Sequence, residues 1–274
     1  MGIRHDIAGD WHASLAALAW QVDLGVDEVI GDDPVNRYDL PDTTRADTNR
    51  PAATPVAAPL AATAAPPPDQ PKVDPVEVAR AAAARATSLP ALRDIIAAFD
   101  LCDLKKGARN TVFADGNPAA RVLILGEAPG REEDIEGRPF VGRAGQLLDR
   151  MFAAIGLSRG AADPEAAVYI TNVLPWRPPG NRDPEPAEVA MMRPFVERHI
   201  ALMNPQVIVV MGNTPLYALT GQKGVMRARG TWTTVLGKPM LPMVHPAYLL
   251  RNPIAKREAW ADLLSLQARL ANGA

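Results

Sequence analysis

Short apolar runs alternate with segments of helical periodicity along the later part of the chain. Continuous apolar stretches predict buried strands at residues 121–126, 168–174, 206–211 and 239–244. Around them, apolar residues at helical spacing predict helices at residues 76–86, 91–100, 142–155, 186–203, 214–220 and 256–272. Strands separated by helices are typical of a mostly parallel sheet that is covered on both faces, so we expect an α/β fold.

The chain divides by composition into three segments, and the third of them is the expected globular domain. Residues 1–40 are expected to be a helical extension, because apolar positions fall near helical spacing over residues 10–31. Residues 41–75 hold 9 prolines and 9 alanines among 35 positions, a composition that packs no core and predicts an extended linker. Residues 76–274 then form the globular domain. The extension is interpreted as a solvated appendage or as a docking helix for a protein partner.

Composition excludes several classes of protein. Cys102 is the single cysteine, which excludes a disulfide framework and a metal site built only of thiolates. No apolar run reaches the roughly 18 residues of a membrane span, and the N-terminus has no signal-peptide core, so we expect a cytoplasmic protein without membrane contact. Residues 1–89 carry a net charge of −6 and residues 90–274 a net charge of +4. This asymmetry is compatible with a nucleic-acid partner without requiring one.

The turn after the first expected strand is rich in glycine and carboxylates. Its sequence, GEAPGREED from Gly126 to Asp134, does not match the dinucleotide-binding fingerprint. A tight turn here can point backbone amides at a ligand. Four carboxylates within eight positions suit a site that orients a water or stabilises a cationic sugar. The alternative is an acidic helix N-terminus favoured by the helix dipole, which we hold open for Glu132 and Asp134.

Two further strand ends carry polar residues. Asn172 offers a donor and an acceptor in one plane, which suits the edge of a base, although an asparagine at such a position is more often a turn cap. His245 directly follows the fourth strand and can donate a hydrogen bond to a developing anion, although a structural histidine is the alternative. The nearby Leu249–Arg251 combines apolar side chains with a cation, a pattern that fits either wedges entering a duplex or the first turn of a packed helix.

Together these segments resemble the family 4 uracil-DNA glycosylases. The resemblance covers residues 101–264 and rests on GEAPGREEDIEGRPFVGRAGQLLD, ITNVLPWRPPGNRDPEPAEV, PQVIVVMG and HPAYLLRNPIAKREAWADL, in the order found in the family. The leader sequence WQVDLGVDEVIGDDPVNRYDLP also resembles the N-terminal extension of proteobacterial members. The resemblance implies a three-layer α/β/α sandwich on a four-stranded parallel sheet, and we expect a monomer. It implies hydrolysis of the N-glycosidic bond of deoxyuridine in DNA, the first step of base excision repair.

The resemblance also implies roles for individual residues. Phe140 would stack on the flipped uracil, Asn172 would read its polar edge, and His245 would donate to the carbonyl oxygen that gathers negative charge. The backbone from Gly126 to Ala128 would contact the base. Glu133, and secondarily Glu127, would be the catalytic carboxylates. The residues expected to contact DNA are Arg177, Asn181, Arg182, Leu249, Leu250 and Arg251.

One departure from the family concerns its [4Fe–4S] cluster, which four cysteines normally hold. The corresponding positions in this chain are Phe99, Cys102, Trp176 and Met192. We therefore expect no cluster and no other metal, and we expect the three apolar residues to fill the space of the cluster. Two alternative functions stay open. One is a DNA-binding protein of the same fold without catalysis, and the other is a glycosylase for another base, such as hypoxanthine or a 5-substituted uracil.

Overall fold

The computed structural model describes Leu15 and residues 74–273. The chain divides into two units, Met1–Pro66 and Pro67–Ala274, and the second unit is described here by itself. The expected helix over residues 10–31 and the linker over residues 41–75 lie almost wholly outside the described residues. Within the described part of the chain, no helix is long and apolar enough to cross a membrane.

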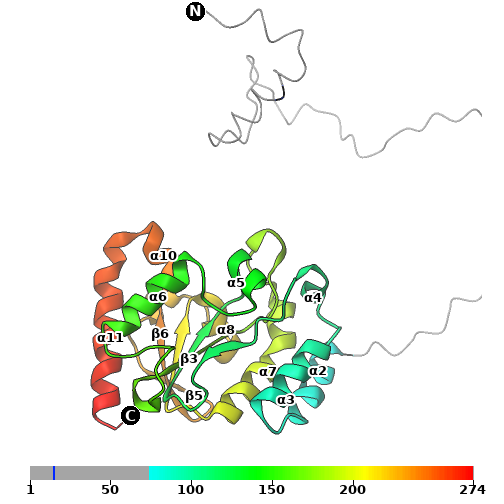
Figure 1. Ribbon diagram of the computed structural model, residues 1–274, viewed down its shortest axis with the longest axis horizontal. Coiled ribbons are helices and arrows are strands. Elements are labelled where there is room, and N and C mark those ends of the chain that lie inside the picture. The colour runs from blue at the N-terminus through cyan, green and yellow to red at the C-terminus, as the bar shows by residue number, and fades with distance from the viewer. Residues whose placement is uncertain (1–14, 16–73, 274) are drawn as a thin grey trace, which may run out of the picture. The chain divides into compact units, whose positions relative to one another are not determined.

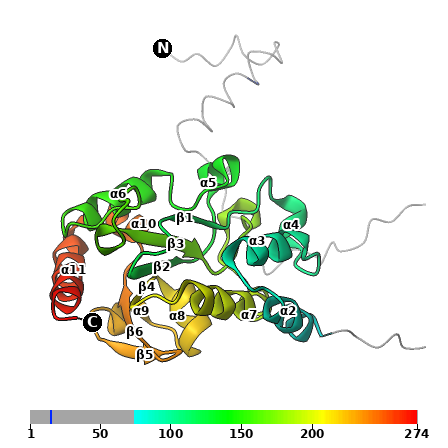
Figure 2. The ribbon, with the colours of Figure 1, turned by 60° about the horizontal axis from the view of Figure 1, so that its bottom comes forward.

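In the described part of the chain, six strands form one sheet in the order β1-β3-β2-β4-β6-β5 (Figure 1, Figure 2). Their bounds are β1 Ala114–Gly116, β2 Val122–Gly126, β3 Val168–Asn172, β4 Val207–Met211, β5 Thr233–Val235 and β6 Lys238–Met243. The central strands β3, β2, β4 and β6 run parallel, and each of the two edge strands pairs antiparallel with its neighbour. The expectation of an α/β fold on four parallel strands is thus confirmed for the centre of the sheet. The total of four strands is wrong, because β1 and β5 complete the edges.

The two edge strands carry little sequence signal. Each is three residues long, with the sequences Ala-Asp-Gly and Thr-Thr-Val, and each is partly exposed. Strands this short hold too few residues for a recognisable alternation of apolar and polar positions. They form because the exposed edges of β3 and β6 offer unpaired backbone groups to the chain that passes beside them.

Helices cover both faces of the sheet (Figure 2). Their bounds are α2 Pro75–Ala84, α3 Leu89–Ala98, α4 Leu104–Gly107, α5 Arg131–Glu136, α6 Arg143–Ala153, α7 Pro186–Met203, α8 Asn213–Thr220, α9 Val225–Ala228, α10 Pro246–Arg251 and α11 Lys256–Ala271, with single 3-10 turns at Pro164–Ala166, Pro179–Asn181 and Pro253–Ala255. Helices α2, α3, α7 and α8 lie on one face, and α6 and α11 lie on the other. This arrangement confirms the three-layer sandwich.

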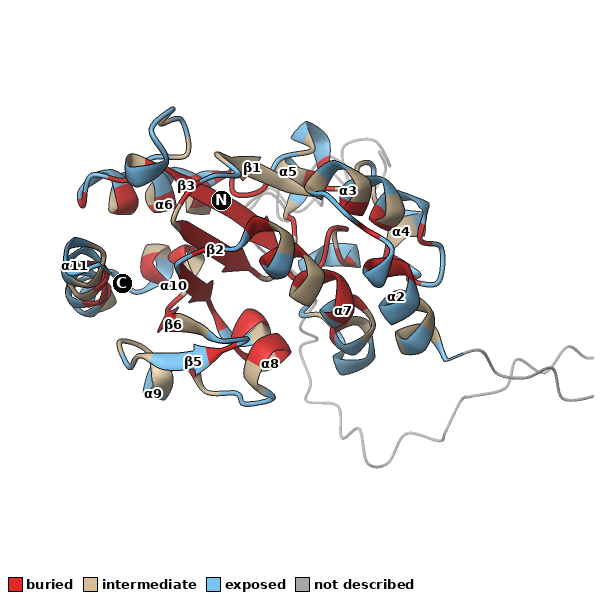
Figure 3. Cartoon of the chain, turned by 90° about the horizontal axis from the view of Figure 1, so that it is seen from below, coloured by how far each residue is buried: buried red, intermediate tan, exposed pale blue. Residues whose placement is uncertain are grey.

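The alternation of side chains along the strands explains the two cores. Leu123 and Leu125 of β2 pack with the first set of helices, whereas Ile124 packs with the second, because successive side chains of a strand point to opposite faces. All five residues of β2, β3 and β4 are buried, so the strands form the red centre of Figure 3. Strands that are buried on both faces read as continuous apolar runs, which is why these three were predictable.

The parallel strands place their carboxyl ends at one edge of the sheet. In such sheets the ligand site lies beyond those ends. Here β2 ends at Gly126, β3 ends at Asn172, β4 is followed by Gly212, and β6 leads to His245. Residues that are far apart in the sequence therefore start from neighbouring points on the sheet.

Candidate active site

The last residues of β2 and β3 are directly paired, and they form the floor of the site. Gly126 lies opposite Asn172 in the parallel register. A Cβ atom on Gly126 would lie 2.3 Å from Oδ1 of Asn172 and 2.5 Å from Cε2 of Phe140. These distances are far shorter than any normal contact. Only glycine at this position therefore allows the amide and the aromatic ring to approach the strand end together.

The side chain of Asn172 is buried and incompletely satisfied. Its relative exposure is 7%, and Oδ1 receives no hydrogen bond from any residue that the structure describes. A buried acceptor without a donor costs free energy, roughly 1–3 kcal/mol, and such groups are rare in folded proteins. The position beside Phe140 and Gly126 makes this oxygen a candidate to accept a hydrogen bond from a ligand.

The ring of Phe140 lies against the imidazole of His245. Their centroids are 5.4 Å apart and their planes differ by 28°. At the end of β4, a Cβ atom on Gly212 would lie 3.6 Å from Cβ of His245. The structure therefore brings the four residues expected around the base, Gly126, Phe140, Asn172 and His245, to one place.

His245 is held in a defined tautomer. It is the N-cap of α10, and its Nδ1 accepts a hydrogen bond from the backbone N–H of Ala247 at 3.2 Å. In a neutral imidazole the proton then resides on Nε2, which is free to donate elsewhere. The pKa of His245 is lowered to about 4, mainly by burial and also by the charge of Arg251, whereas the charge of Glu133 opposes this shift. At neutral pH the ring is an uncharged donor.

Glu133 binds backbone amides with both of its carboxylate oxygens. Oε1 accepts hydrogen bonds from the N–H groups of Val141 and Gly142, each at 3.0 Å, and Oε2 accepts one from Gly130 at 3.0 Å. As placed, the carboxylate fixes the loop that carries Phe140. A direct role for Glu133 in the reaction stays a prediction.

The neighbouring carboxylates differ in their surroundings. Oδ1 of Asp134 accepts hydrogen bonds from the backbone amides of Arg109 at 2.8 Å and Asn110 at 3.2 Å, and the residue is buried. Asp134 therefore fixes a loop, whereas Glu132 is exposed.

Glu127 accepts a hydrogen bond from the hydroxyl of Thr214 at the start of α8. Burial raises the pKa of Glu127, although the Thr214 hydroxyl opposes the shift. The next residue, Ala128, is partly buried and packs against the core on the face of α7.

The basic loop after β3 is an exposed surface. Arg177 donates to Oδ1 of Asn181 at 2.7 Å, which stabilises the turn. Arg182 is paired with Glu188 of α7 at 2.6 Å. Asn181 and Arg182 are exposed and Arg177 is partly buried, so the structure leaves Asn181 and Arg182 accessible to a large ligand.

The expectation for Leu249 is wrong. Its exposure is 1%, and it packs in a small core with Val244 and Ala259, so it cannot enter a duplex from this position. The reason is that α10 begins right after His245, and its helical turn directs Pro246 and Leu249, three positions apart, inward. Leu250 is half-buried and Arg251 is exposed, so these two remain on the accessible surface.

The residues at the family's cluster positions do not fit a [4Fe–4S] cluster. Phe99, Cys102, Trp176 and Met192 are all buried in one hydrophobic core. The rings of Phe99 and Phe195 pack edge to face, with their centroids 5.2 Å apart. Iron–sulfur clusters need several thiolates, and here one thiol is present whose pKa burial raises.

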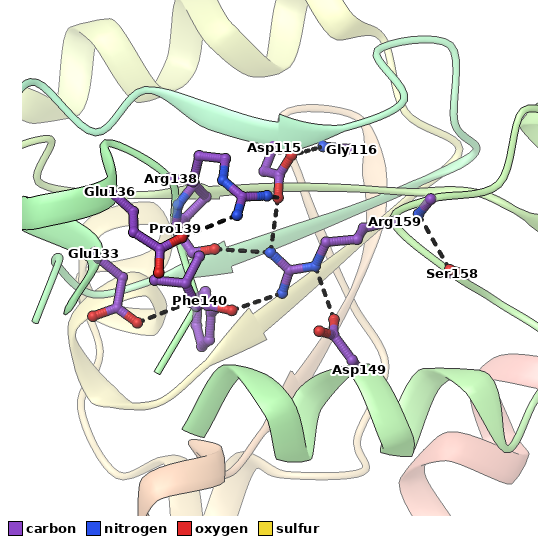
Figure 4. Close-up of polar contacts among 12 residues, drawn as sticks. Asp115, Gly116, Glu133, Glu136, Arg138, Pro139, Phe140, Asp149, Ser158 and Arg159 are labelled. Carbon is purple, nitrogen blue, oxygen red and sulfur yellow. Dashed lines mark hydrogen bonds and ion pairs between the residues drawn. The ribbon is translucent and has the colours of Figure 1, made fainter. Parts of the chain in front are cut away.

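Sequence reasoning missed one polar residue near the site, Arg159. Figure 4 shows its guanidinium among Asp115, Asp149 and the backbone of Pro139 and Phe140. In the sequence it is a single arginine in a loop after a helix, with no pattern around it. The left-handed backbone of Phe140, which Arg159 contacts, is likewise invisible in the sequence.

Comparison with known proteins adds independent information. A family model described as the Uracil DNA glycosylase superfamily matches residues 113–264, a range that contains all four residues gathered at the strand ends. The chain is 43% identical over 154 residues to a type-4 uracil-DNA glycosylase of Thermotoga maritima, which covers 55% of this chain and 77% of that relative. It is 36% identical over 196 residues to a type-4 uracil-DNA glycosylase of Saccharolobus solfataricus, covering 68% and 88%. A third relative with the same name, from Archaeoglobus fulgidus, is 38% identical over 174 residues, covering 59% and 82%.

Proposed function

Because the chain belongs to the type-4 branch of the uracil-DNA glycosylase superfamily, we propose that it hydrolyses the bond between uracil and deoxyribose in DNA. The products are free uracil and DNA with an abasic site. This reaction is the first step of base excision repair. A base inside a duplex is out of reach of such an enzyme, so the target nucleotide must be extruded into the site.

The observation that carries the proposal is the unsatisfied Oδ1 of Asn172. Uracil presents an N–H donor at N3, which suits this buried acceptor. Cytosine presents a lone pair at the same position, so the acceptor would stay unpaired. A site built to bind a hydrogen-bonding group rejects an analogue that lacks it strongly, because its own polar atom is then stranded. The neighbouring Phe140 offers an aromatic face on which the flipped base can stack.

His245 supports the departure of the base. As the glycosidic bond breaks, negative charge collects on the uracil, mainly on its carbonyl oxygens. The Nε2–H of a neutral imidazole can donate to such an oxygen, and the donor is oriented before the reaction by the bond from Ala247 to Nδ1. Pre-oriented donors of this kind are usually the largest single contribution to rate.

The carboxylates of the turn after β2 support the other half of the reaction. The deoxyribose becomes positively charged in the transition state, and a nearby carboxylate stabilises it or positions the attacking water. Glu127 is partly buried at the strand end, and the charge of Glu133 acts on His245. In our proposal Glu127 and Glu133 supply this negative field, with Glu133 also holding its loop.

The surface around the site supports binding to DNA. Arg177, Asn181 and Arg182 would contact phosphates on one side. Leu250 and Arg251 would occupy the space that the extruded nucleotide leaves. We also propose that the protein works without an iron–sulfur cluster, since apolar side chains stand at three of the four family positions.

The test is a fluorescent oligonucleotide with one uracil, incubated with the full chain and then cleaved with alkali. We expect cleavage at uracil, none at thymine, and a strong loss of cleavage for Asn172→Ala. Binding to DNA without cleavage at any base would favour the inactive DNA-binding protein, and cleavage only at hypoxanthine would favour a different base. Either result would overturn the proposal.

A further inference from the structure

Phe140 has a backbone conformation that its side chain does not favour. Its φ angle is +54°, in the left-handed region that bulky residues rarely adopt. Such a conformation persists only where the surroundings hold it, and it is frequent at functional sites. The question is which groups hold the Phe140 backbone in place.

Four hydrogen bonds fix the peptide groups around Phe140. Two are donated by the side chain of Arg159, and two are accepted by the side chain of Glu133. Arg159 donates from Nη1 to the carbonyl of Pro139 and from Nη2 to the carbonyl of Phe140, each at 2.9 Å. The two following amides, those of Val141 and Gly142, donate to Glu133. The segment is therefore held by its carbonyls on one side and by its amides on the other (Figure 4).

Arg159 is itself fixed by two carboxylates. Its Nη1 donates to Oδ2 of Asp115 on β1 at 3.0 Å, and its Nε donates to Oδ1 of Asp149 on α6 at 2.8 Å. The Arg159 side chain is only 15% exposed. Arg138 lies 3.6 Å from the same Asp115 carboxylate, farther from it than Arg159. The guanidinium thus ties the edge strand and α6 to the Phe140 loop.

We propose that Arg159 is a positioning residue of the glycosylase reaction, which acts by holding the Phe140 ring in the orientation that the flipped base needs. The inference rests on the proposed function. Arg159 donates hydrogen bonds to the backbone carbonyls of Pro139 and Phe140, so its effect on the reaction would pass through the position of the Phe140 ring. Errors of about 1 Å in such positioning can lower a rate roughly 100-fold.

The experiment compares Arg159→Gln with Arg121→Gln. Arg121 is a matched control because its side chain is 16% exposed, pairs with Glu165 and donates to the carbonyl of Leu270 at 3.0 Å, but it precedes β2 at the opposite end of the strand. Urea unfolding should show comparable losses of stability. Uracil excision at saturating DNA, which reports kcat, should fall about 10- to 100-fold for Arg159→Gln and stay within about twofold for Arg121→Gln. The affinity for uracil-free DNA should not change.

A double-mutant cycle with Phe140→Ala separates positioning from general damage. If Arg159 acts through the ring, Arg159→Gln added to Phe140→Ala should lower the rate further by less than about threefold. Arg159→Lys, which keeps the charge but not the planar fork, should be folded and intermediate in rate. The inference is overturned if Arg159→Gln lowers the excision rate by the same factor with and without Phe140→Ala. It is also overturned if Arg121→Gln loses as much excision activity as Arg159→Gln, or if Arg159→Lys and Arg159→Gln are both fully active. Inactivity of the wild-type chain on uracil would instead overturn the proposed function and this inference with it.

Discussion

The aromatic ring of Phe140 and the imidazole of His245 lie face to face, with centroids 5.4 Å apart, although one follows β2 and the other follows β6. The contact joins the residue proposed to stack on the base to the residue proposed to stabilise its negative charge. Because the two rings share a surface, the donor and the stacking platform have a fixed relation before any ligand binds.

Replacing His245 by alanine should remove the donor to the departing base. We expect uracil excision to fall roughly 100- to 1,000-fold, which is the usual cost of losing one such donor. The measurement is single-turnover cleavage of the uracil oligonucleotide, with circular dichroism as the check on folding. A folded His245→Ala protein with the wild-type rate would contradict the assigned role.

Adding one methyl group at Gly126 should disrupt the site without a change in polar chemistry. In Gly126→Ala the new Cβ collides with Asn172 and Phe140, so we expect at least a roughly 100-fold loss of excision. Gly107→Ala is the matched control, because a Cβ there meets no atom within 4 Å. Equal activity of the two variants would show that the packing at the strand ends does not matter for catalysis.

Substitutions of the two leucines of α10 should have different effects, one on protein stability and the other on contact with DNA. Leu249→Ala removes a side chain from a closed core and should lower the free energy of unfolding by about 2–5 kcal/mol. Leu250→Ala should change stability little and should weaken excision from double-stranded DNA more than from single-stranded DNA. Urea unfolding and excision assays on both substrates check this prediction, and a large loss of stability for Leu250→Ala would contradict it.

Acid should destabilise the protein because two histidines, the buried His199 and the partly buried His245, resist protonation. Burial lowers the pKa of His199 to about 3 and that of His245 to about 4, whereas both take up protons near pH 6.5 in the unfolded chain. The unfolded state therefore binds more protons below pH 6.5, and stability falls as the pH drops through this range, by up to about 1.4 kcal/mol per pH unit for each histidine.

Urea titrations at pH 7, 6 and 5 measure this loss. His199 stacks on Phe113 and lies 3.0 Å from the hydroxyl of Tyr169. His199→Leu should be less stable at pH 7, yet its stability should depend less on pH between 7 and 5. An unchanged slope would mean that His199 is not a source of the acid sensitivity.

The apolar residues at the cluster positions predict a protein that needs no iron. Anaerobically purified protein should contain no stoichiometric iron and no absorption shoulder near 400 nm. Cys102→Ala should keep uracil excision within about twofold, with a modest loss of stability from the small cavity. Stoichiometric iron in the purified wild type would overturn this expectation.

The central strands were predictable from the sequence because burial on both faces leaves continuous apolar runs. The residues at their ends were predictable because the polar motifs directly follow those runs in the sequence. The edge strands were not, since their pairing depends on backbone groups of β3 and β6 rather than on their own side chains. Leu249 was misassigned because exposure depends on how α10 packs, which its sequence does not reveal. Arg159 was not predicted because two of its partners are backbone carbonyls, which every residue possesses, and the other two, Asp115 and Asp149, lie far from it in the sequence.

The register between β2 and β3 aligns Gly126 with Asn172 at the last step of the ladder. A slip of a single residue would turn the amide of Asn172 toward the opposite layer of helices, since neighbouring side chains point to opposite faces. In the proposed function, discrimination between uracil and cytosine, which differ at N3 and in the exocyclic group on C4, thus depends on the same backbone pairing that folds the sheet. Insertions or deletions within either strand should therefore damage fidelity as well as folding.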